Sequence, residues 1–371
     1  MKILLIGEYS NVHNTLAKGL RELGHTVCVA SDGDGWKNYP RDIDLEREHA
    51  GRWGFLLNLL KALPQMKGYD VVQIINPVFL ELKAERIRPV YDWLRRHNGK
   101  IVMGAFGLDY YWAKVNSELM PMRYSDFNLG QEVRTDSVSS LYLKEWIGTP
   151  KEKLNRYIAS DCDGIVAGLY EYWATYNEVC ETGRGGVSIR DKMEFIPFPI
   201  VMPDNPVTSI SGRPVRVFIG ISRNRSAYKG TDVMLRAAQN VMAAHPGAME
   251  LKVAEGVPFN EYQRMMDDCD VLLDQLYGYS PAMNSLLAMS KGIVVVGGAE
   301  PENYDILKET ELRPVINVQP SYDSVYRELE KLIMNPETIP DLKIQSVGYV
   351  RRHHEYMKVA EQYSDYYVRL F

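Results

Sequence analysis

A regular alternation of short apolar runs with helical patterns is the feature that most constrains the fold of this chain. In the first half, apolar runs typical of buried strands occur at Lys2–Ile6, Val27–Ala30, Val71–Ile75, Ile101–Ala105, Ile165–Ala167 and Glu194–Ile196. Helical patterns lie between several of them, at Thr15–Leu23, Ala84–His97 and Leu154–Ser160. Strands that alternate with helices predict a parallel sheet with helices on its faces.

The alternation stops once and then starts again. Prolines at 197, 199, 203 and 206, followed by Ser209–Gly212, predict a linker. Beyond it we expect strands at Val215–Ile219, Glu250–Ala254, Val271–Asp274, Ile293–Val296 and Pro314–Asn317. Helices are expected at Thr231–Ala244, Glu261–Cys269 and Pro281–Ser290, and Ile344–Phe371 reads as one long, tyrosine-rich helix. The sequence therefore predicts an α/β protein with two doubly wound parallel-sheet domains at 1–200 and 213–342, followed by a terminal segment at 343–371.

Charge and cysteine content exclude several classes of protein. The net charge is −5, so no overall basic field is present to hold a nucleic acid. Cys28, Cys162, Cys180 and Cys269 are scattered, without a C-x-x-C pair, which argues against a zinc site and against a disulfide framework. The run Ile3–Ile6 is too short for a signal peptide or a membrane span. We therefore expect a cytoplasmic protein with reduced thiols.

Two doubly wound domains bind ligands where the carboxyl ends of their strands face each other, so the loops after strands are the candidate sites. The first loop contains Glu8, Tyr9, Ser10 and Asn11 and lacks the G-x-G-x-x-G pattern of dinucleotide sites. It either presents main-chain N–H groups to a substrate, in which case we assign it to the acceptor, or is a plain turn.

A basic loop follows the first strand of the second half. It runs from Ser222 to Thr231 and carries Arg225 and Lys229, which can neutralise a diphosphate. Gly230 permits a close approach of the main chain, and Thr231 can cap the next helix. The alternative is a solvated basic loop.

A third candidate is the start of the predicted helix Pro281–Ser290. Ser280 before Pro281 suits an N-cap followed by the first helical residue, and Asn284 and Ser285 follow in the first turn. The positive end of such a helix attracts an anion, although the same pattern also describes an ordinary cap.

D-x-D triplets begin, among other places, at Asp32, Asp161 and Asp268, and such triplets can hold a divalent ion. The last two precede strands and so belong to the edge away from the cleft. His353 and His354 are adjacent on a predicted helix and do not share a face. We therefore predict no metal site.

At these residues the chain resembles the GT-B-fold glycosyltransferases of glycosyltransferase family four. The resemblance is carried by Lys2–Val27, by Lys229-Gly230-Thr231-Asp232, by Glu255–Pro258 with Asp270–Leu276, and by Leu286–Gly292. It implies that Arg225 and Lys229 bind the diphosphate of the donor, that Gly256, Val257 and Pro258 meet the base, and that the terminal helix crosses back onto the first domain.

The chain departs from that family's pattern at three positions. The two glutamates of the family correspond to Tyr279 and Leu287, and the histidine of its first domain corresponds to Phe106. Leu287 cannot accept the hydrogen bonds of a ribose, and Asn284, three residues earlier, is a partial substitute. Asp109 lies close to Phe106 in sequence and is a polar substitute for the histidine, so we list Asp109 with Arg225 and Lys229 as the catalytic residues.

The resemblance implies a retaining hexosyltransferase that uses a UDP- or GDP-sugar, without a further cofactor, in surface polysaccharide synthesis. The acceptor would be a glycan or a lipid-linked glycan, reached by peripheral contact with the inner face of a membrane. Basic residues at 83, 86, 88, 95 and 96 suit such a contact, or form a solvated helix face. The alternatives are a non-catalytic GT-B protein that binds nucleotide or glycan, and another GT-B enzyme such as an epimerase or a phosphorylase.

Overall fold

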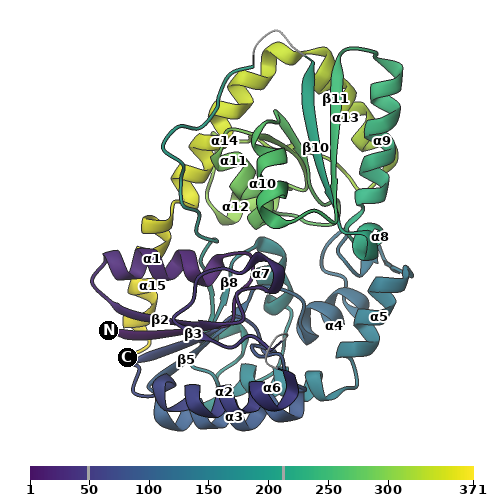
Figure 1. Ribbon diagram of the computed structural model, residues 1–371. Helices are drawn as coiled ribbons and strands as arrows, with labels where there is room; N and C mark the ends of the chain where they lie inside the picture. The colour runs from purple at the N-terminus through teal and green to yellow at the C-terminus, as the bar shows by residue number, and fades with distance from the viewer. Residues whose placement is uncertain (48–50, 211–213) are drawn as a thin grey trace.

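The computed structural model describes residues 1–47, 51–210 and 214–371 and contains two parallel sheets, one above the other in Figure 1. The first sheet, in spatial order, contains β3 (Ile43–Asp44), β2 (Thr26–Ser31), β1 (Lys2–Ile6), β4 (Val71–Ile74), β5 (Lys100–Ala105), β8 (Gly164–Ala167) and β9 (Met193–Phe195). Its neighbouring strands all pair in parallel. The predicted α/β class with parallel sheets is confirmed.

Helices cover both faces of the first sheet, which is why its strands are mainly apolar. Ile3, Leu4, Leu5 and Ile6 of β1 are all 0% exposed. The covering helices are α1 (Val12–Glu22), α2 (Gly51–Ala62), α3 (Ala84–His97), α4 (Tyr110–Glu118), α5 (Ser137–Trp146), α6 (Pro150–Asp161) and α7 (Tyr170–Asn177). A small hairpin of β6 (Asn128–Leu129) and β7 (Glu132–Val133) lies between α4 and α5.

The second sheet has the spatial order β11 (Met249–Glu255), β10 (Val215–Ile221), β12 (Val271–Leu273), β13 (Val294–Gly297) and β14 (Ile316–Asn317). Its helices are α8 (Ser226–Lys229), α9 (Thr231–Ala244), α10 (Phe259–Asp267), α11 (Met283–Ser290), α12 (Pro301–Ile306), α13 (Tyr322–Met334) and α14 (Ile339–His353). The predicted linker Ser209–Gly212 and the predicted domain start at residue 213 fall partly on residues 211–213, which lie outside the described residues.

The predicted single helix over Ile344–Phe371 is wrong, because two helices are present. The first, α14, ends at His353, and α15 (Tyr356–Arg369) follows it. The helix is interrupted where the main chain pairs with Ile200. His354 O accepts from Ile200 N at 2.6 Å, and Tyr356 N donates to Ile200 O at 3.0 Å. The Glu355 carboxylate then caps α15 by accepting from the N–H groups of Met357 and Lys358.

The second of these helices crosses back to the first sheet, as the fold class predicts. In Figure 1 the yellow C-terminal segment descends from α14 along the left side, and α15 lies beside α1. A methyl group on Gly19 of α1 would lie 2.6 Å from Cβ of Ala360, so this glycine permits close packing. Tyr367 of α15 donates to Gln73 Oε1 in β4 at 2.7 Å.

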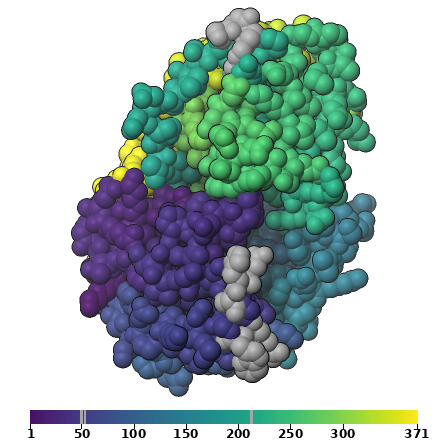
Figure 2. Space-filling view, viewed as in Figure 1, coloured from purple at the N-terminus to yellow at the C-terminus, as the bar shows by residue number. Residues whose placement is uncertain are grey.

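The two sheet-containing halves meet along a broad boundary (Figure 2). The segment between α4 and α5 supplies much of the contact. Arg134 in this segment is 8% exposed and donates to Ala227 O at 2.8 Å and to Tyr228 O at 3.1 Å in the other half. Arg123 donates to Glu300 at 2.7 Å and to Glu302 at 2.7 Å.

None of the helices in the described ranges has the length and apolarity that a membrane crossing requires.

Candidate functional site

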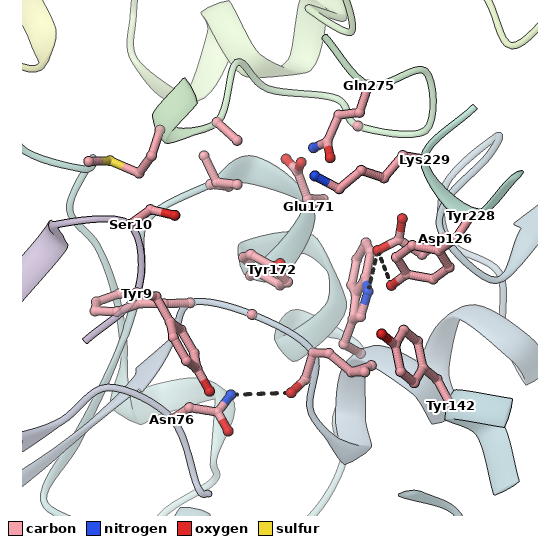
Figure 3. A pocket seen from close by; sticks show the side chains of 18 of the residues that line it. Tyr9, Ser10, Asn76, Asp126, Tyr142, Glu171, Tyr172, Tyr228, Lys229 and Gln275 are labelled. Atoms are coloured by element: carbon pink, nitrogen blue, oxygen red, sulfur yellow. Dashed lines mark hydrogen bonds between the residues drawn. The ribbon is translucent and has the colours of Figure 1, made fainter. Parts of the chain in front are cut away.

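A cavity of about 470 Å³ lies between the two halves, within the size range of small-molecule sites. From the first sheet it is lined by Tyr9 after β1, Asn76 after β4 and Phe106 after β5. From the second sheet it is lined by Lys229 and Gln275, which follow β10 and β12. Figure 3 shows these loops approaching one space from both halves. The carboxyl ends of both sheets thus face the same site, as expected for doubly wound domains.

A second cavity, of about 640 Å³, adjoins the first and shares Tyr9, Arg225 and Lys229 with it. Its other walls belong mainly to the first half and include Asp32, Asp34, Trp36 and Glu81. Trp36 is 62% exposed and packs edge-on against Phe259 of α10. Carboxylates beside an exposed indole suit a hydroxylated ligand, because carboxylates accept from hydroxyl groups and the ring packs on an apolar sugar face.

Two positively charged side chains, those of Arg225 and Lys229, lie at the junction of the two cavities. Arg225 ends a 3₁₀ turn over Arg223–Arg225, and Lys229 ends the short helix α8. Gly230, at φ 74°, then reverses the chain into α9. Burial lowers the pKa of Lys229, whereas Asp274 and Asp126 raise it by charge attraction.

Within the described residues neither Arg225 nor Lys229 forms an ion pair, although Arg223 beside them pairs with Glu255 at 2.8 Å. Two unpaired positive charges between two cavities suit an anionic group with neutral groups on either side of it.

Buried acids face the same cavity. Asp126 Oδ2 accepts from the Tyr228 hydroxyl at 2.8 Å and from Trp112 Nε1 at 3.1 Å. Glu171 is 4% exposed and lies in the first turn of α7. Burial raises the pKa of Asp126 and raises that of Glu171 to about 7. The sequence analysis missed both residues and Tyr172. Tyr228 and Gln275 lie within the predicted basic loop and the segment Asp270–Leu276, but were not named as site residues.

The first loop is shaped by Glu8. Its Oε1 accepts from His13 N at 3.2 Å and its Oε2 from Asn14 N at 2.8 Å, so α1 begins at Val12 and not at the predicted Thr15. Burial raises the pKa of Glu8 to about 7.

The predicted acceptor residues are divided between the two cavities. Tyr9 and Ser10 line the first cavity and Glu8 the second, whereas Asn11 lines neither.

Asp109 does not line either cavity. It is 0% exposed and caps α4 by accepting from Trp112 N at 2.7 Å and from the Tyr176 hydroxyl at 2.6 Å. Burial raises the pKa of Asp109 to about 6. The structure thus places this predicted catalytic residue behind the wall of the site.

The predicted cap at Ser280 is wrong. Helix α11 begins at Met283 with Ala282 at its N-cap, and Ser280 Oγ instead accepts from Tyr170 N at 3.2 Å. Asn284 and Ser285 donate to Asp274 and do not line the cavities, although Ala282 and Met283 line the first.

The remaining predicted donor residues are only partly brought together. Ser222 lines the second cavity. Gly256, Val257 and Pro258 line neither cavity, and Pro258 precedes α10 at its N-cap. The Tyr279 hydroxyl accepts from Arg123 N at 2.8 Å, and Leu287 packs against the apolar core.

Most aspartates of the D-x-D triplets form ion pairs with basic side chains. Asp163 pairs with Arg95, Asp268 pairs with Arg216 and with Lys252 at 2.7 Å, and Asp270 pairs with Lys343 at 2.9 Å. Only the triplet at Asp32–Asp34 reaches a cavity, where Asp34 accepts from Ser10 N at 2.8 Å and also pairs with Lys37. No cluster of three potential ligands for a metal ion is found in the part of the chain that the structure describes.

Comparison with known proteins gives no sequence match, either to a family model or to a curated protein. Similar solved structures do exist. Alr3699/HepE from Anabaena, solved with UDP and glucose, is 11% identical over 98% of both chains, with a TM-score of 0.58. Sucrose-phosphate synthase from Thermosynechococcus elongatus is 14% identical over 100% of this chain and 99% of its own, with a TM-score of 0.59.

A third solved structure is the UDP-GlcNAc 2-epimerase from Neisseria meningitidis bound to UDP-GlcNAc. It is 11% identical over 100% of both chains, with a TM-score of 0.52. The chain therefore has the GT-B glycosyltransferase fold. At these identities the likeness concerns the fold, and the function has to be argued from the site.

Proposed function

We propose that this protein is a glycosyltransferase that moves a hexose from a nucleotide diphosphate sugar to a glycan or lipid-linked acceptor. The observation that carries the proposal is the pair Arg225 and Lys229, unpaired within the described residues and shared by two cavities. A diphosphate at this junction would direct its sugar into one cavity and its nucleoside into the other. UDP is the first donor nucleotide to test, because the similar structures of HepE and of the epimerase contain UDP or a UDP-sugar.

The chemistry needs little covalent participation by the protein. The bond between the anomeric carbon and the diphosphate breaks, and negative charge grows on the departing phosphate oxygens. Arg225 and Lys229 lie where they would stabilise that charge, and the walls of the cavities would hold donor and acceptor in position. In this proposal Asp109 shapes the wall through α4 and does not touch the donor. Retention of anomeric configuration and a role in surface polysaccharide synthesis rest on the family resemblance.

The alternative is a non-catalytic protein that binds nucleotide or glycan. It is favoured by Tyr279 and Leu287, which stand where the resembled family has glutamates and which serve contacts elsewhere in the fold. Release of UDP or GDP from sugar nucleotides, with and without acceptor glycans, together with analysis of the sugar, separates a transferase, an epimerase and a non-catalytic binder. A transferase releases nucleotide in an acceptor-dependent manner, an epimerase changes the sugar, and a non-catalytic binder does neither.

Replacing Lys229 with alanine is expected to weaken binding of UDP by about 10- to 100-fold, since a hydrogen bond to a charged group contributes about 1.5–3 kcal/mol. Calorimetric titration with UDP and with GDP measures the effect. Lys331→Ala is the matched control, because Lys331 is an exposed lysine on α13. Equal affinities of the Lys229→Ala variant and the unaltered protein would refute the diphosphate assignment.

We further propose that the first half touches an anionic membrane surface at the inner face of the membrane. Lys83, Arg86, Arg88 and Arg96 are exposed on or beside α3, whereas Arg95 is committed to Asp163. Helix α2 lies near α3 at the bottom of Figure 1 and carries exposed apolar side chains. They are Leu56 at 42%, Leu57 at 58% and Leu60 at 55% exposure.

Vesicles of phosphatidylcholine with phosphatidylglycerol are expected to carry the protein upward in a flotation gradient at low salt. The double variant Arg86→Glu/Arg88→Glu should stay at the bottom, because each basic residue near such a surface contributes about 1 kcal/mol. Arg327→Glu/Lys331→Glu, an equal charge reversal on exposed positions of α13, should still float. Flotation that is unchanged by the first double variant would contradict this surface.

A further inference from the structure

Glu171 is the acidic group in the first cavity whose bonding is least complete. The residue is 4% exposed, and its Oε2 atom is buried without a hydrogen-bond partner in the described residues. Leaving a buried polar atom unpaired is unfavourable, so such an atom in a cavity wall has capacity to bind a polar group of a ligand. Its position follows from the chain, because Glu171 comes directly after the loop that leaves β8.

Gln275 approaches the same point from the other half. A methyl group added to Gly278 would lie 3.4 Å from Glu171 Oε1 and 3.3 Å from Gln275 Nε2, so both side chains converge on this glycine. Gln275 has no recorded side-chain hydrogen bond to any described residue. The site thus offers a carboxyl group and an amide, one from each half, with bonding capacity left over.

The neighbouring cation fixes which part of a ligand would reach these groups. Figure 3 draws Glu171, Gln275 and Lys229 around one end of the cavity, with their polar ends turned toward one another. We assign the sugar of a donor whose diphosphate is held by Lys229 to the first cavity, beside this carboxyl group. Burial also raises the pKa of Glu171 to about 7, so near neutral pH the group can accept or donate a hydrogen bond.

We propose that Glu171 and Gln275 bind the hydroxyl groups of the donor sugar and select a neutral hexose over a uronic acid. The proposal rests on the proposed function, because it requires the donor diphosphate at Lys229. Two neighbouring hydroxyls suit a carboxyl group that accepts through both oxygens, while the amide supplies one donor and one acceptor. A uronic acid would bring a second carboxylate into a buried site that already holds one, which is unfavourable.

Calorimetric titration of the Glu171→Ala and Glu171→Gln variants with UDP, UDP-glucose and UDP-glucuronate tests this proposal, and a GDP series covers the other base. The alanine variant is expected to bind UDP-glucose at least about 10-fold more weakly, the loss of a hydrogen bond to a charged group, and UDP less than about twofold more weakly. The glutamine variant keeps the shape and should narrow the preference for UDP-glucose over UDP-glucuronate. Glu178→Gln, at the exposed end of α7, is the control. It should change neither the affinity for UDP-glucose relative to UDP nor the affinity for UDP-glucose relative to UDP-glucuronate.

The possible outcomes separate this proposal from the proposed function. Equal losses for UDP and UDP-glucose, or no loss for UDP-glucose, would overturn the role of Glu171 while leaving nucleotide binding established. If the unaltered protein binds no nucleotide, the donor function fails, and saturation-transfer NMR with free glucose then decides the sugar site. A glucose signal that disappears in Glu171→Ala supports the site, and the absence of any signal overturns it.

Discussion

Replacing Lys343 with alanine is expected to lower the free energy of unfolding of the second half by about 3–5 kcal/mol, the range for breaking a buried ion pair from one side. Lys343 Nζ lies 2.9 Å from Asp270 Oδ1, with the two side chains only 2% and 1% exposed. Asp270 directly precedes β12, and Lys343 belongs to α14, so the pair joins the sheet to a covering helix. The variant removes the cation from a buried carboxylate, which keeps the hydrogen bond from Arg216 N to Asp270 Oδ2 at 3.0 Å.

Hydrogen exchange measured by mass spectrometry is the suitable readout for this variant. All six tryptophans lie at or before residue 173, and Trp36 packs against Phe259 of α10, so their fluorescence does not report on the second half by itself. Exchange in β12 and α14 should accelerate, while exchange in β1 and β4 should not. The double variant Lys343→Met/Asp270→Asn should recover much of the loss, because it removes both charges and keeps the volume. A loss below about 1 kcal/mol in the alanine variant would show that the pair is unimportant.

Most strands of the two sheets were predictable because they are short apolar runs, whereas the two-residue strand β3 was not predicted. The predicted Lys2–Ile6 coincides with β1, and the predicted Val215–Ile219 forms most of β10. Helix ends were less predictable, because distant groups determine them. The Glu8 carboxylate starts α1 early, and the contact of His354 with the crossover at Ile200 divides the terminal helix.

The site was predictable only where a loop follows a strand on one side of the cleft. The basic loop with Arg225 and Lys229 satisfied that rule, and both residues line the cavities. Glu171 satisfies the same rule after the strand Ile165–Ala167, and applying the rule to every strand would have found it. Asp126 lies in a segment without strand or helix periodicity, so only the packing of Trp112 and Tyr228 around it identifies it.

The family resemblance places carboxylates at the positions of Tyr279 and Leu287. The structure instead supplies one, Glu171, from the first half. Tyr279 has no carboxylate, and its hydroxyl accepts from the main chain of Arg123. The neighbouring Ser280 and the main chain of Tyr279 instead lie close enough to Glu171 to favour its charged form. If Glu171 binds the donor sugar as proposed, the binding site is complete only when the two halves are held together.

Arg134 is the residue whose loss should most weaken the contact between the two halves. Its guanidinium donates to Ala227 O at 2.8 Å and to Tyr228 O at 3.1 Å, and it lies 3.5 Å from the centre of the Tyr277 ring. On its own side it pairs with Asp136 at 3.2 Å. Ala227 and Tyr228 belong to α8, which also carries Lys229, so this contact positions the cation that we assign to the diphosphate.

Replacing Arg134 with alanine is expected to lower the free energy of unfolding by about 3–5 kcal/mol, because a buried charge is removed and its partners remain. Hydrogen exchange in residues 226–230 should accelerate, and the affinity for UDP should fall because Lys229 is no longer held. Arg134→Lys keeps the charge without the planar fork and should recover only part of both effects. Arg327→Ala, at 71% side-chain exposure on α13, is the control and should stay within about 0.5 kcal/mol. Unchanged exchange in residues 226–230 of the Arg134→Ala variant would show that α8 is held by its own half, and the weakened binding would then need another cause.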